Sequence, residues 1–118
     1  MNPTVRILEP SGILDGTQSP DFRQEIEACI GDRVRIILID LKKVTFMDSS
    51  GLGALVQALQ TTRNANVKLH LCSLNPQLRM LFELTGLDDI FPIYPDRAKF
   101  ERQVLEAPLP GDKDWSKG

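Results

Sequence analysis

The segment from Arg35 to Leu41 restricts the fold of this chain more than any other. Three isoleucines and two leucines stand among its seven residues, with no alternation of apolar and polar side chains. A strand with one face in water shows such alternation, whereas an unbroken apolar run is typical of a strand covered on both faces. The segment therefore predicts a central strand in a sheet flanked by helices, with Asp40 at the rim of that sheet.

Two short strands and a helix are predicted before this central strand. Val5 to Leu8 suits a strand, and after a turn at Pro10 to Gly12 the pair Ile13 to Leu14 would return as the second strand of a hairpin. A helix follows, whose expected N-cap is Ser19 and whose expected C′ residue is Gly31. Its apolar stripe repeats at helical spacing and consists of Phe22, Ile26, Cys29 and Ile30.

Two helices and a strand are predicted after the central strand. A helix beginning near Ser49 fades near Arg63 to Asn66, and a strand runs from Val67 to Cys72. The next helix is expected to begin at the N-cap Asn75 and to end at Gly86. The apolar stripes of these two helices are Leu52, Leu55, Val56 and Leu59 in the first, and Leu78, Leu81, Phe82 and Thr85 in the second.

The last predicted elements are a short strand over Ile90 to Tyr94 and a weaker helix from Pro95 to about Glu106. The resulting order, β-β-α-β-α-β-α-β-α, predicts an α/β fold with a mixed, mostly parallel β-sheet and helices packed on it. The opening hairpin would add an antiparallel strand at one side. We expect one domain over residues 1–106 and a flexible tail over residues 107–118, which contains Trp115.

Composition argues against several classes of function. The formal net charge is −2, from 14 basic and 16 acidic residues, so no broad cationic surface is expected for nucleic acid. No stretch approaches the roughly 20 apolar residues that span a bilayer, and no signal peptide is recognised. We therefore expect a cytoplasmic protein without membrane contact. Cys29 and Cys72 are widely separated, and both are predicted to be reduced core residues.

Polar and small residues gather in one corner, after the central strand and before the helix that follows it. Asp48, Ser49 and Ser50 precede Gly51 and Gly53, and a strand is expected to end just before Asp48. Helix capping accounts for the aspartate and the serines, because their side-chain oxygens accept hydrogen bonds from free amides in a first helical turn. Capping does not account for the glycines, each of which weakens a helix by roughly 1 kcal/mol relative to alanine.

Functional groups in parallel sheets gather on the loops at the carboxyl ends of the strands, and this corner is such a loop. Asp15 follows the second predicted strand and is expected near the corner. Small residues beside exposed serines would form a low, flat patch that the backbone of another protein could approach. From the residues alone, helix capping and a protein-binding surface both remain open.

The residues present are poorly suited to catalysis or to holding a cofactor. A serine nucleophile needs a base, yet His70 is the single histidine and falls inside a predicted strand. The corner also departs from the G-x-S-x-G elbow of serine hydrolases, and Gly51 and Gly53 lack the Gly-Lys-Ser/Thr ending of a phosphate-binding loop. No cluster of histidines, cysteines and carboxylates suggests a metal site. We therefore expect no enzyme activity, no cofactor and no metal.

The segment from Leu38 to Gly53, which ends in Asp-Ser-Ser-Gly-Leu-Gly, resembles the signature of STAS domains and specifically of bacterial anti-sigma factor antagonists. The early loop from Gly12 to Asp15 and the segment from Asn75 to Leu87 are also similar to this family. The order of elements agrees over residues from about 4 to 106. The resemblance implies the STAS fold and a regulatory protein that binds other proteins.

The resemblance also implies a mechanism. In this family the serine directly after the aspartate, Ser49 here, is phosphorylated by a partner that is both an anti-sigma factor and a serine kinase of the ATPase type. The unphosphorylated protein binds that partner and frees the sigma factor, and a phosphoserine phosphatase restores this state. The implied partner-binding surface consists of Asp15, Asp48, Ser49, Ser50, Gly51, Leu52 and Gly53.

Other interpretations stay open. A STAS module could serve a different kinase–phosphatase signalling pathway or a lipid-transport complex, although the intact aspartate and serines favour phosphorylation. A small serine hydrolase using Ser49 is a more remote alternative. The oligomeric state is not indicated by the sequence.

Overall fold

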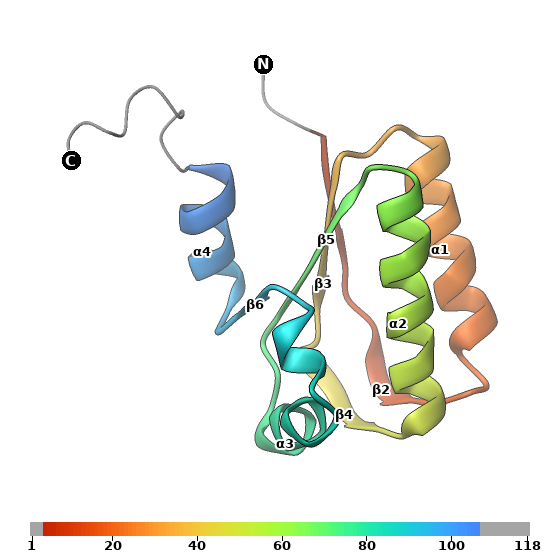
Figure 1. Cartoon of the computed structure of the whole chain (residues 1–118), viewed down its shortest axis with the longest axis vertical. Coiled ribbons are helices and arrows are strands. Elements are labelled where there is room, and N and C mark those ends of the chain that lie inside the picture. Colours follow the sequence, from red (N-terminus) through yellow and green to blue (C-terminus); the bar gives the residue numbers. More distant parts are fainter. Residues whose placement is uncertain (1–3, 107–118) are drawn as a thin grey trace.

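Parallel strands form the centre of the structure, a computed structural model that describes residues 4–106 (Figure 1). The larger sheet contains β1 (Val5–Leu8), β3 (Ile36–Asp40), β5 (Lys68–Cys72) and β6 (Ile93–Tyr94), in the order β1-β3-β5-β6. A separate two-stranded sheet contains β2 (Ser11–Leu14) and β4 (Lys43–Met47). Every pairing among these strands is parallel. The predicted α/β class and the predominance of parallel strands are confirmed.

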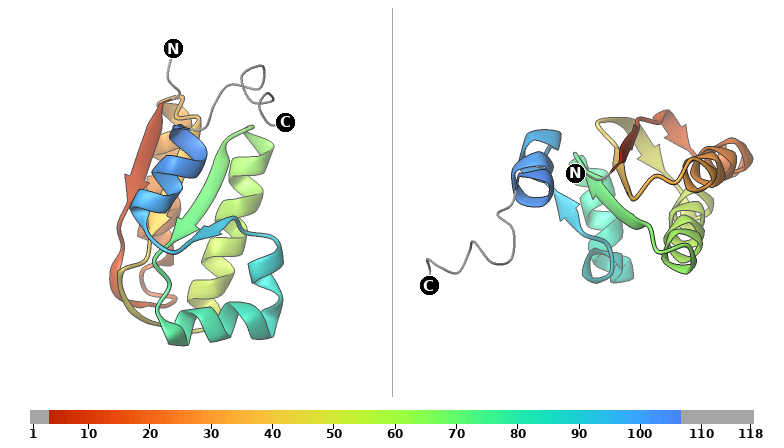
Figure 2. Two further views of the ribbon diagram at one scale, coloured as in Figure 1. Left: turned by 90° about the vertical axis from the view of Figure 1, so that its left-hand side faces the viewer. Right: turned by 90° about the horizontal axis from the view of Figure 1, so that it is seen from above.

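Helices cover both faces of the larger sheet, as the buried central strand predicted. The helices α1 (Ser19–Gly31) and α2 (Ser49–Asn64) lie side by side on one face (Figures 1 and 2). On the other face lies α4 (Arg97–Phe100), which continues into the π-helical segment η2 (Glu101–Leu105). The helix α3 (Pro76–Thr85) and the short 3-10 helix η1 (Leu87–Asp89) lie at the end of the sheet where β5 finishes.

The apolar run of the central strand is buried completely. Ile37 and Ile39 belong to the core beneath α1 and α2, whereas Leu38 packs with Phe100 of α4 on the opposite face. Because both faces of β3 are covered, no position in the middle of the strand meets water, and this explains the lack of polar alternation.

Both cysteines are buried free thiols, in agreement with the sequence. Burial raises the pKa of the Cys29 thiol, and it raises the pKa of Cys72 to about 11. Since the thiolate is the form that attacks electrophiles and binds metals, two protonated thiols act at neutral pH as small core residues.

The predicted antiparallel hairpin at the start of the chain is wrong. β1 pairs with β3 and β2 pairs with β4, so the chain leaves one sheet after Leu8 and enters the other at Ser11, inside the segment that was predicted to be a turn. The order of the other major elements agrees with the prediction, and the structure adds β4 to it. No glycine or proline separates β4 from the central strand, which is why the sequence shows no boundary between them.

Both ends of α3 agree with the prediction, with Asn75 as the N-cap and Gly86 at the end of the helix. The Asn75 side chain accepts a hydrogen bond of 2.9 Å from the backbone N–H of Leu78, as an N-cap does. Gly86 ends the helix in the left-handed region, with a φ of 76°. Glycine adopts this conformation without the steric cost that other residues incur.

The predicted ends of α1 are wrong by one or two residues. Gln18 is the N-cap, whereas Ser19 is already helical and its hydroxyl donates a hydrogen bond to the backbone carbonyl of Asp15. Gly31 is the last helical residue, and the left-handed position falls on Arg33, with a φ of 63°. The chain thus turns after α1 on a residue that the sequence does not mark.

The C-terminal elements are shorter than predicted. Of the segment from Ile90 to Tyr94, only the last two residues form a strand, because the N–H of Phe91 instead donates to the carbonyl of Leu87 in the preceding turn. The following helix is confirmed and is capped by Asp96, whose side chain accepts a hydrogen bond from the N–H of Lys99. The predicted flexible tail and Trp115 lie outside the described residues, and the domain boundary at residue 106 stays a prediction.

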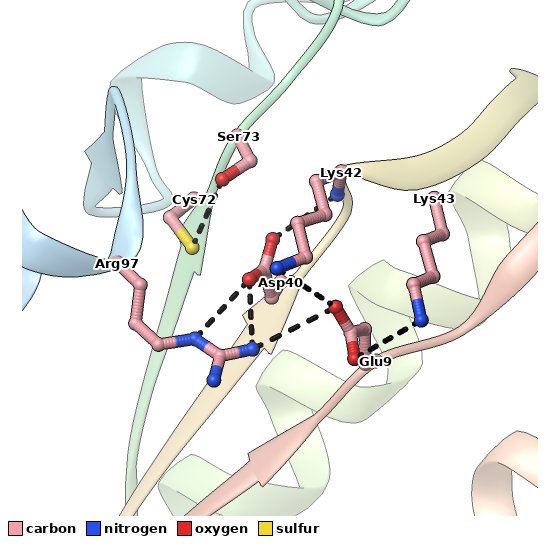
Figure 3. A network of polar contacts seen from close by, with 7 residues as sticks. All are labelled: Glu9, Asp40, Lys42, Lys43, Cys72, Ser73 and Arg97. Carbon is pink, nitrogen blue, oxygen red and sulfur yellow. Dashed lines mark hydrogen bonds and ion pairs between the residues drawn. The ribbon is translucent and has the colours of Figure 1, made fainter.

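Asp40 lies at the end of β3, as expected, but it is only 1% exposed and holds α4 to the sheet (Figure 3). Its carboxylate accepts hydrogen bonds from Nη2 and Nε of Arg97 at 3.0 and 3.3 Å, and from the N–H of Lys42 at 3.1 Å. Burial opposes ionisation, but these hydrogen bonds outweigh it and lower the pKa of Asp40. Glu9 adds a longer contact of 3.7 Å to Arg97 and so ties the loop after β1 to the same group.

We expect Arg97→Met to lower the free energy of unfolding by about 2–3 kcal/mol, because Asp40 would keep a buried charge without its cation. The cost falls below that of a fully buried pair, since the Arg97 side chain is 37% exposed. The matched control is Arg6→Met, whose ion pair with Asp32 has a similar distance of 3.2 Å between exposed side chains. The control should cost less than about 1 kcal/mol. Urea denaturation measures both variants, and equal small losses would contradict the role of the buried pair.

Candidate functional site

The corner between β4 and α2 begins with Asp48, which is the N-cap of α2. Its Oδ1 accepts a hydrogen bond of 3.0 Å from the backbone N–H of Gly51. β4 ends at Met47 and α2 begins at Ser49, as the sequence predicted. The side chains of Ser49 and Ser50 are exposed and make no hydrogen bond to other residues within 4–106. Capping therefore uses the aspartate and leaves both serine hydroxyls free for other chemistry.

The loop after β2 lies beside this corner. Leu14 is the register partner of Met47 in the parallel pair, so the next residues along, Asp15 and Asp48, follow adjacent strand ends. Gly16 lies against α2 as well, because a Cβ added to it would stand 3.6 Å from the Oγ of Ser50. The structure thus brings the two loops together, as the position of Asp15 in the sequence suggested.

Gly51 is required by the close approach of two chain segments. A Cβ added to this residue would collide with the backbone carbonyl of Leu14, while the N–H of Asp48 donates to the same carbonyl oxygen at 3.4 Å. The first turn of α2 can therefore lie directly on the end of β2 only if residue 51 has no side chain. Around Gly53, in contrast, no atom lies within 4 Å of an added Cβ. Close packing explains the first glycine of the motif and leaves the second unexplained.

The residues of the predicted binding surface differ in their accessibility. Gly51 and Leu52 are buried, and Leu52 belongs to the core under α2. Residues 51 and 52 thus orient the helix and are not offered to a partner. The residues that remain accessible at the corner are Asp15 and Asp48, which are half-buried, and Ser49, Ser50 and Gly53, which are exposed.

The corner carries uncompensated negative charge. Hydrogen bonds from the hydroxyl and the backbone N–H of Thr17, at 2.7 and 2.9 Å, lower the pKa of Asp15. Within the described part of the chain, neither Asp15 nor Asp48 has a cationic group within 4.0 Å. At neutral pH this edge therefore presents anionic groups around Ser49.

Asn75 is a residue of this region whose full role the sequence did not reveal. Besides capping α3, its Nδ2 donates hydrogen bonds to the backbone carbonyls of Val44 at 3.1 Å and Thr45 at 3.4 Å. The side chain thus holds the strand that leads to Asp48. Because it lies 30 residues beyond the strand it holds, no local spacing could have indicated the contact.

His70 is engaged away from the corner. It lies on β5, its Nδ1 is 3.2 Å from the hydroxyl of Tyr94, and its ring centroid is 5.3 Å from that of Phe100 in α4. α4 and α2 cover opposite faces of the sheet (Figure 2). His70 is the single histidine of the sequence, so no histidine is available as the base that a serine hydrolase would need beside Ser49.

The described residues contain neither a cluster suited to a metal ion nor a helix that could span a membrane. No group of three or more histidine, cysteine, aspartate or glutamate side chains within residues 4–106 is arranged to hold a metal ion. In the same range, the helices are too short or too polar to cross a membrane. What the corner offers is an exposed hydroxyl among carboxylates at a helix N-terminus.

Comparison with known proteins decides the family. The model of the STAS domain family matches residues 1–100. The chain belongs to the STAS domain family. An anti-sigma-B factor antagonist of Listeria monocytogenes is 36% identical over 83 residues, which cover 70% of this chain and 73% of that protein. An anti-sigma F factor antagonist of Paenibacillus polymyxa is 34% identical over 91 residues, which cover 76% of this chain and 78% of that protein.

Solved structures agree with this assignment. The crystal structure of an anti-sigma factor antagonist from Mycobacterium paratuberculosis superimposes with a TM-score of 0.73 and 28% sequence identity, over 86% of this chain and 85% of that one. The predicted resemblance to STAS domains and to anti-sigma factor antagonists is thereby confirmed.

Gly51→Ala tests the close approach of α2 to β2. We expect it to lower the free energy of unfolding by about 2 kcal/mol or more, because the added methyl group collides with a backbone carbonyl that cannot rotate away. Gly53→Ala is the matched control two residues along the same helix, and it should stabilise the protein by roughly 0.5–1 kcal/mol because alanine is the better helix former. Thermal and urea denaturation measure both changes. Similar effects of the two substitutions would contradict the packing argument.

His70 predicts a pH dependence of stability. Burial, with a smaller contribution from the nearby charge of Lys68, lowers the pKa of His70 below its ordinary value of 6.5. The unfolded chain thus binds a proton before the folded one does, and the free energy of unfolding should fall as the pH drops from about 7.5 through 6.5, by at most about 1.4 kcal/mol per pH unit. Urea denaturation at several pH values should show this slope in the wild type and a flatter one in His70→Phe. If His70→Phe shows the same slope as the wild type, titratable groups other than His70 cause the pH dependence.

Proposed function

We propose that this STAS protein is an anti-sigma factor antagonist in which phosphorylation of Ser49 switches partner binding. The observation that carries the proposal is that Ser49 is exposed at the start of α2 while Asp48 alone caps the helix. The relatives from Listeria monocytogenes and Paenibacillus polymyxa carry the same functional name, which supports the choice of partner.

A phosphate on Ser49 is compatible with the fold. Phosphorylation adds roughly −1.5 to −2 charge at pH 7 and three acceptor oxygens. The N-terminus of a helix carries partial positive charge and free amides, so α2 tolerates the group. Asp48 and Asp15 oppose it, since their carboxylates lie at the same edge. We therefore expect the phosphate to act mainly through charge and bulk against the partner, without rearranging the domain.

The proposed partner is an anti-sigma factor that is also a serine kinase of the ATPase type. In the unphosphorylated state this protein binds the partner through Asp15, Asp48, Ser49, Ser50 and Gly53, and the sigma factor is released. Gly51 and Leu52 contribute from inside, by fixing the direction of α2. A phosphoserine phosphatase restores the binding-competent state. Because sigma factors act with RNA polymerase, the proposed place of action is the cytoplasm.

Substitutions of Ser49 test the switch. We expect Ser49→Ala to bind the partner constitutively and Ser49→Asp to bind poorly, because the aspartate adds charge where the phosphate would stand. A pull-down from the source organism should retain an ATPase-type kinase with the wild type and lose it with Ser49→Asp. Far-UV circular dichroism should show the same fold for both variants. If both variants retain the kinase as the wild type does, Ser49 is not the switch.

Ser50→Ala provides the matched control for the modified residue. With the retained kinase and ATP, the wild type and Ser50→Ala should each take up one phosphate, whereas Ser49→Ala should take up none; intact mass spectrometry counts the phosphates. Phosphate on Ser50 in the Ser49→Ala variant would reassign the site. If the kinase binds no sigma factor, the module belongs to another kinase–phosphatase pathway.

A further inference from the structure

Two large apolar side chains stand side by side near the proposed phosphorylation site. Ile13 on β2 is 50% exposed and Phe46 on β4 is 47% exposed. They are register partners in the parallel pair, so their side chains leave the two-stranded sheet from the same face. The next pair, Leu14 and Met47, points to the opposite face, and each of these residues is 1% exposed. One face of this small sheet is therefore core and the other is an uncovered apolar surface.

This exposure has no role in holding the fold together. Ile13 and Phe46 take no part in either buried cluster, and their neighbours on the strands, Gly12 and Thr45, are joined instead by a hydrogen bond from the Thr45 hydroxyl to the Gly12 carbonyl. Single apolar residues are common on protein surfaces and need no explanation. Ile13 and Phe46 are register partners, so their exposed side chains are neighbours, and their place beside the proposed phosphorylation site makes this small patch a candidate binding surface.

The patch is continuous with the edge that carries Ser49. Phe46 precedes Ser49 by three residues and Ile13 precedes Asp15 by two. An extended chain advances at most about 3.6 Å per residue, so each apolar residue lies within about 11 Å of the corner, measured between Cα atoms. The carboxylates of Asp15 and Asp48, which have no cation within 4.0 Å in the described residues, border the patch on that side. An apolar centre beside a charged rim is the usual anatomy of a protein interface.

We propose that Ile13 and Phe46 are the apolar anchor with which this protein binds its kinase partner. The matching surface of that partner presents an apolar side chain or pocket with a basic side chain beside it, opposite Asp15 and Asp48. This inference rests on the proposed function. The anchor is the same in both phosphorylation states and supplies affinity for the kinase. A phosphate on Ser49, at the rim of the patch, prevents the kinase from binding there.

The test measures binding of the purified kinase that the wild type retains in the pull-down, by isothermal titration calorimetry. Ile13→Ser combined with Phe46→Ser should weaken the dissociation constant by roughly 10- to 100-fold, as loss of a buried anchor does. Phe46→Leu keeps an apolar side chain and should lose much less. The matched control is Ile90→Ser, because Ile90 is 40% exposed but borders a hollow at the other end of α2, with Arg63 and Lys68. This control should bind as the wild type does.

The outcomes separate this inference from the proposed function. If the double serine variant, shown by urea denaturation to be folded, binds as tightly as the wild type while Ser49→Asp does not bind, the anchor is wrong and the switch stands. If Ser49→Ala and Ser49→Asp both bind like the wild type while the double variant does not, the anchor stands and the switch is wrong. If the double variant binds the kinase normally but abolishes a dimer seen by gel filtration, the patch joins two copies of this chain and the proposal is overturned.

Discussion

The organisation of this protein depends on the contact between the first turn of α2 and the end of β2. Gly51 lies against the carbonyl of Leu14 so closely that no side chain fits there, and the N–H of Asp48 donates to the same oxygen. This contact places the loop with Asp15 beside the loop with Ser49, although 34 positions separate the two residues in the sequence (49 − 15). Packing of backbone on backbone is rigid, so the geometry of the edge is set before any partner arrives.

Much of the fold was accessible from the sequence because its strongest signals are local. The apolar run of β3 specified a strand covered on both faces, and the caps at Asp48 and Asn75 marked the beginnings of two helices. The hairpin failed for a physical reason. Pro10 to Gly12 has the composition of a turn, but Ser11 and Gly12 lie within β2, and whether β2 pairs with β1 or with β4 depends on contacts with residues far along the chain.

The placement of the candidate site residues was predicted in part for the same reason. Asp48 and Ser49 belong to a motif that can be read along the chain, and the proximity of Asp15 follows from parallel strands that end at one edge. The exposure of Phe46 does not follow from its residue type, since an aromatic residue within an apolar segment is normally buried. A shift in register between Gly12 and Ile13 accompanies its position on the outer face. A shift in register of this kind moves the following side chains to the other face of the sheet, and the local sequence does not indicate where it occurs.

The residues of the motif that hold the fold differ from the residue proposed to be phosphorylated, and this separation affects how a switch at Ser49 can operate. Asp48 holds the N-terminus of α2, and Gly51 and Leu52 fix the helix against the core, so the stability of the corner does not depend on Ser49. The Ser49 hydroxyl makes no hydrogen bond within the described residues, and a phosphate attached to it breaks none. A modification that leaves every internal contact in place changes only what a partner meets at the surface. In the proposed switch, this independence lets one domain carry the same fold in two signalling states.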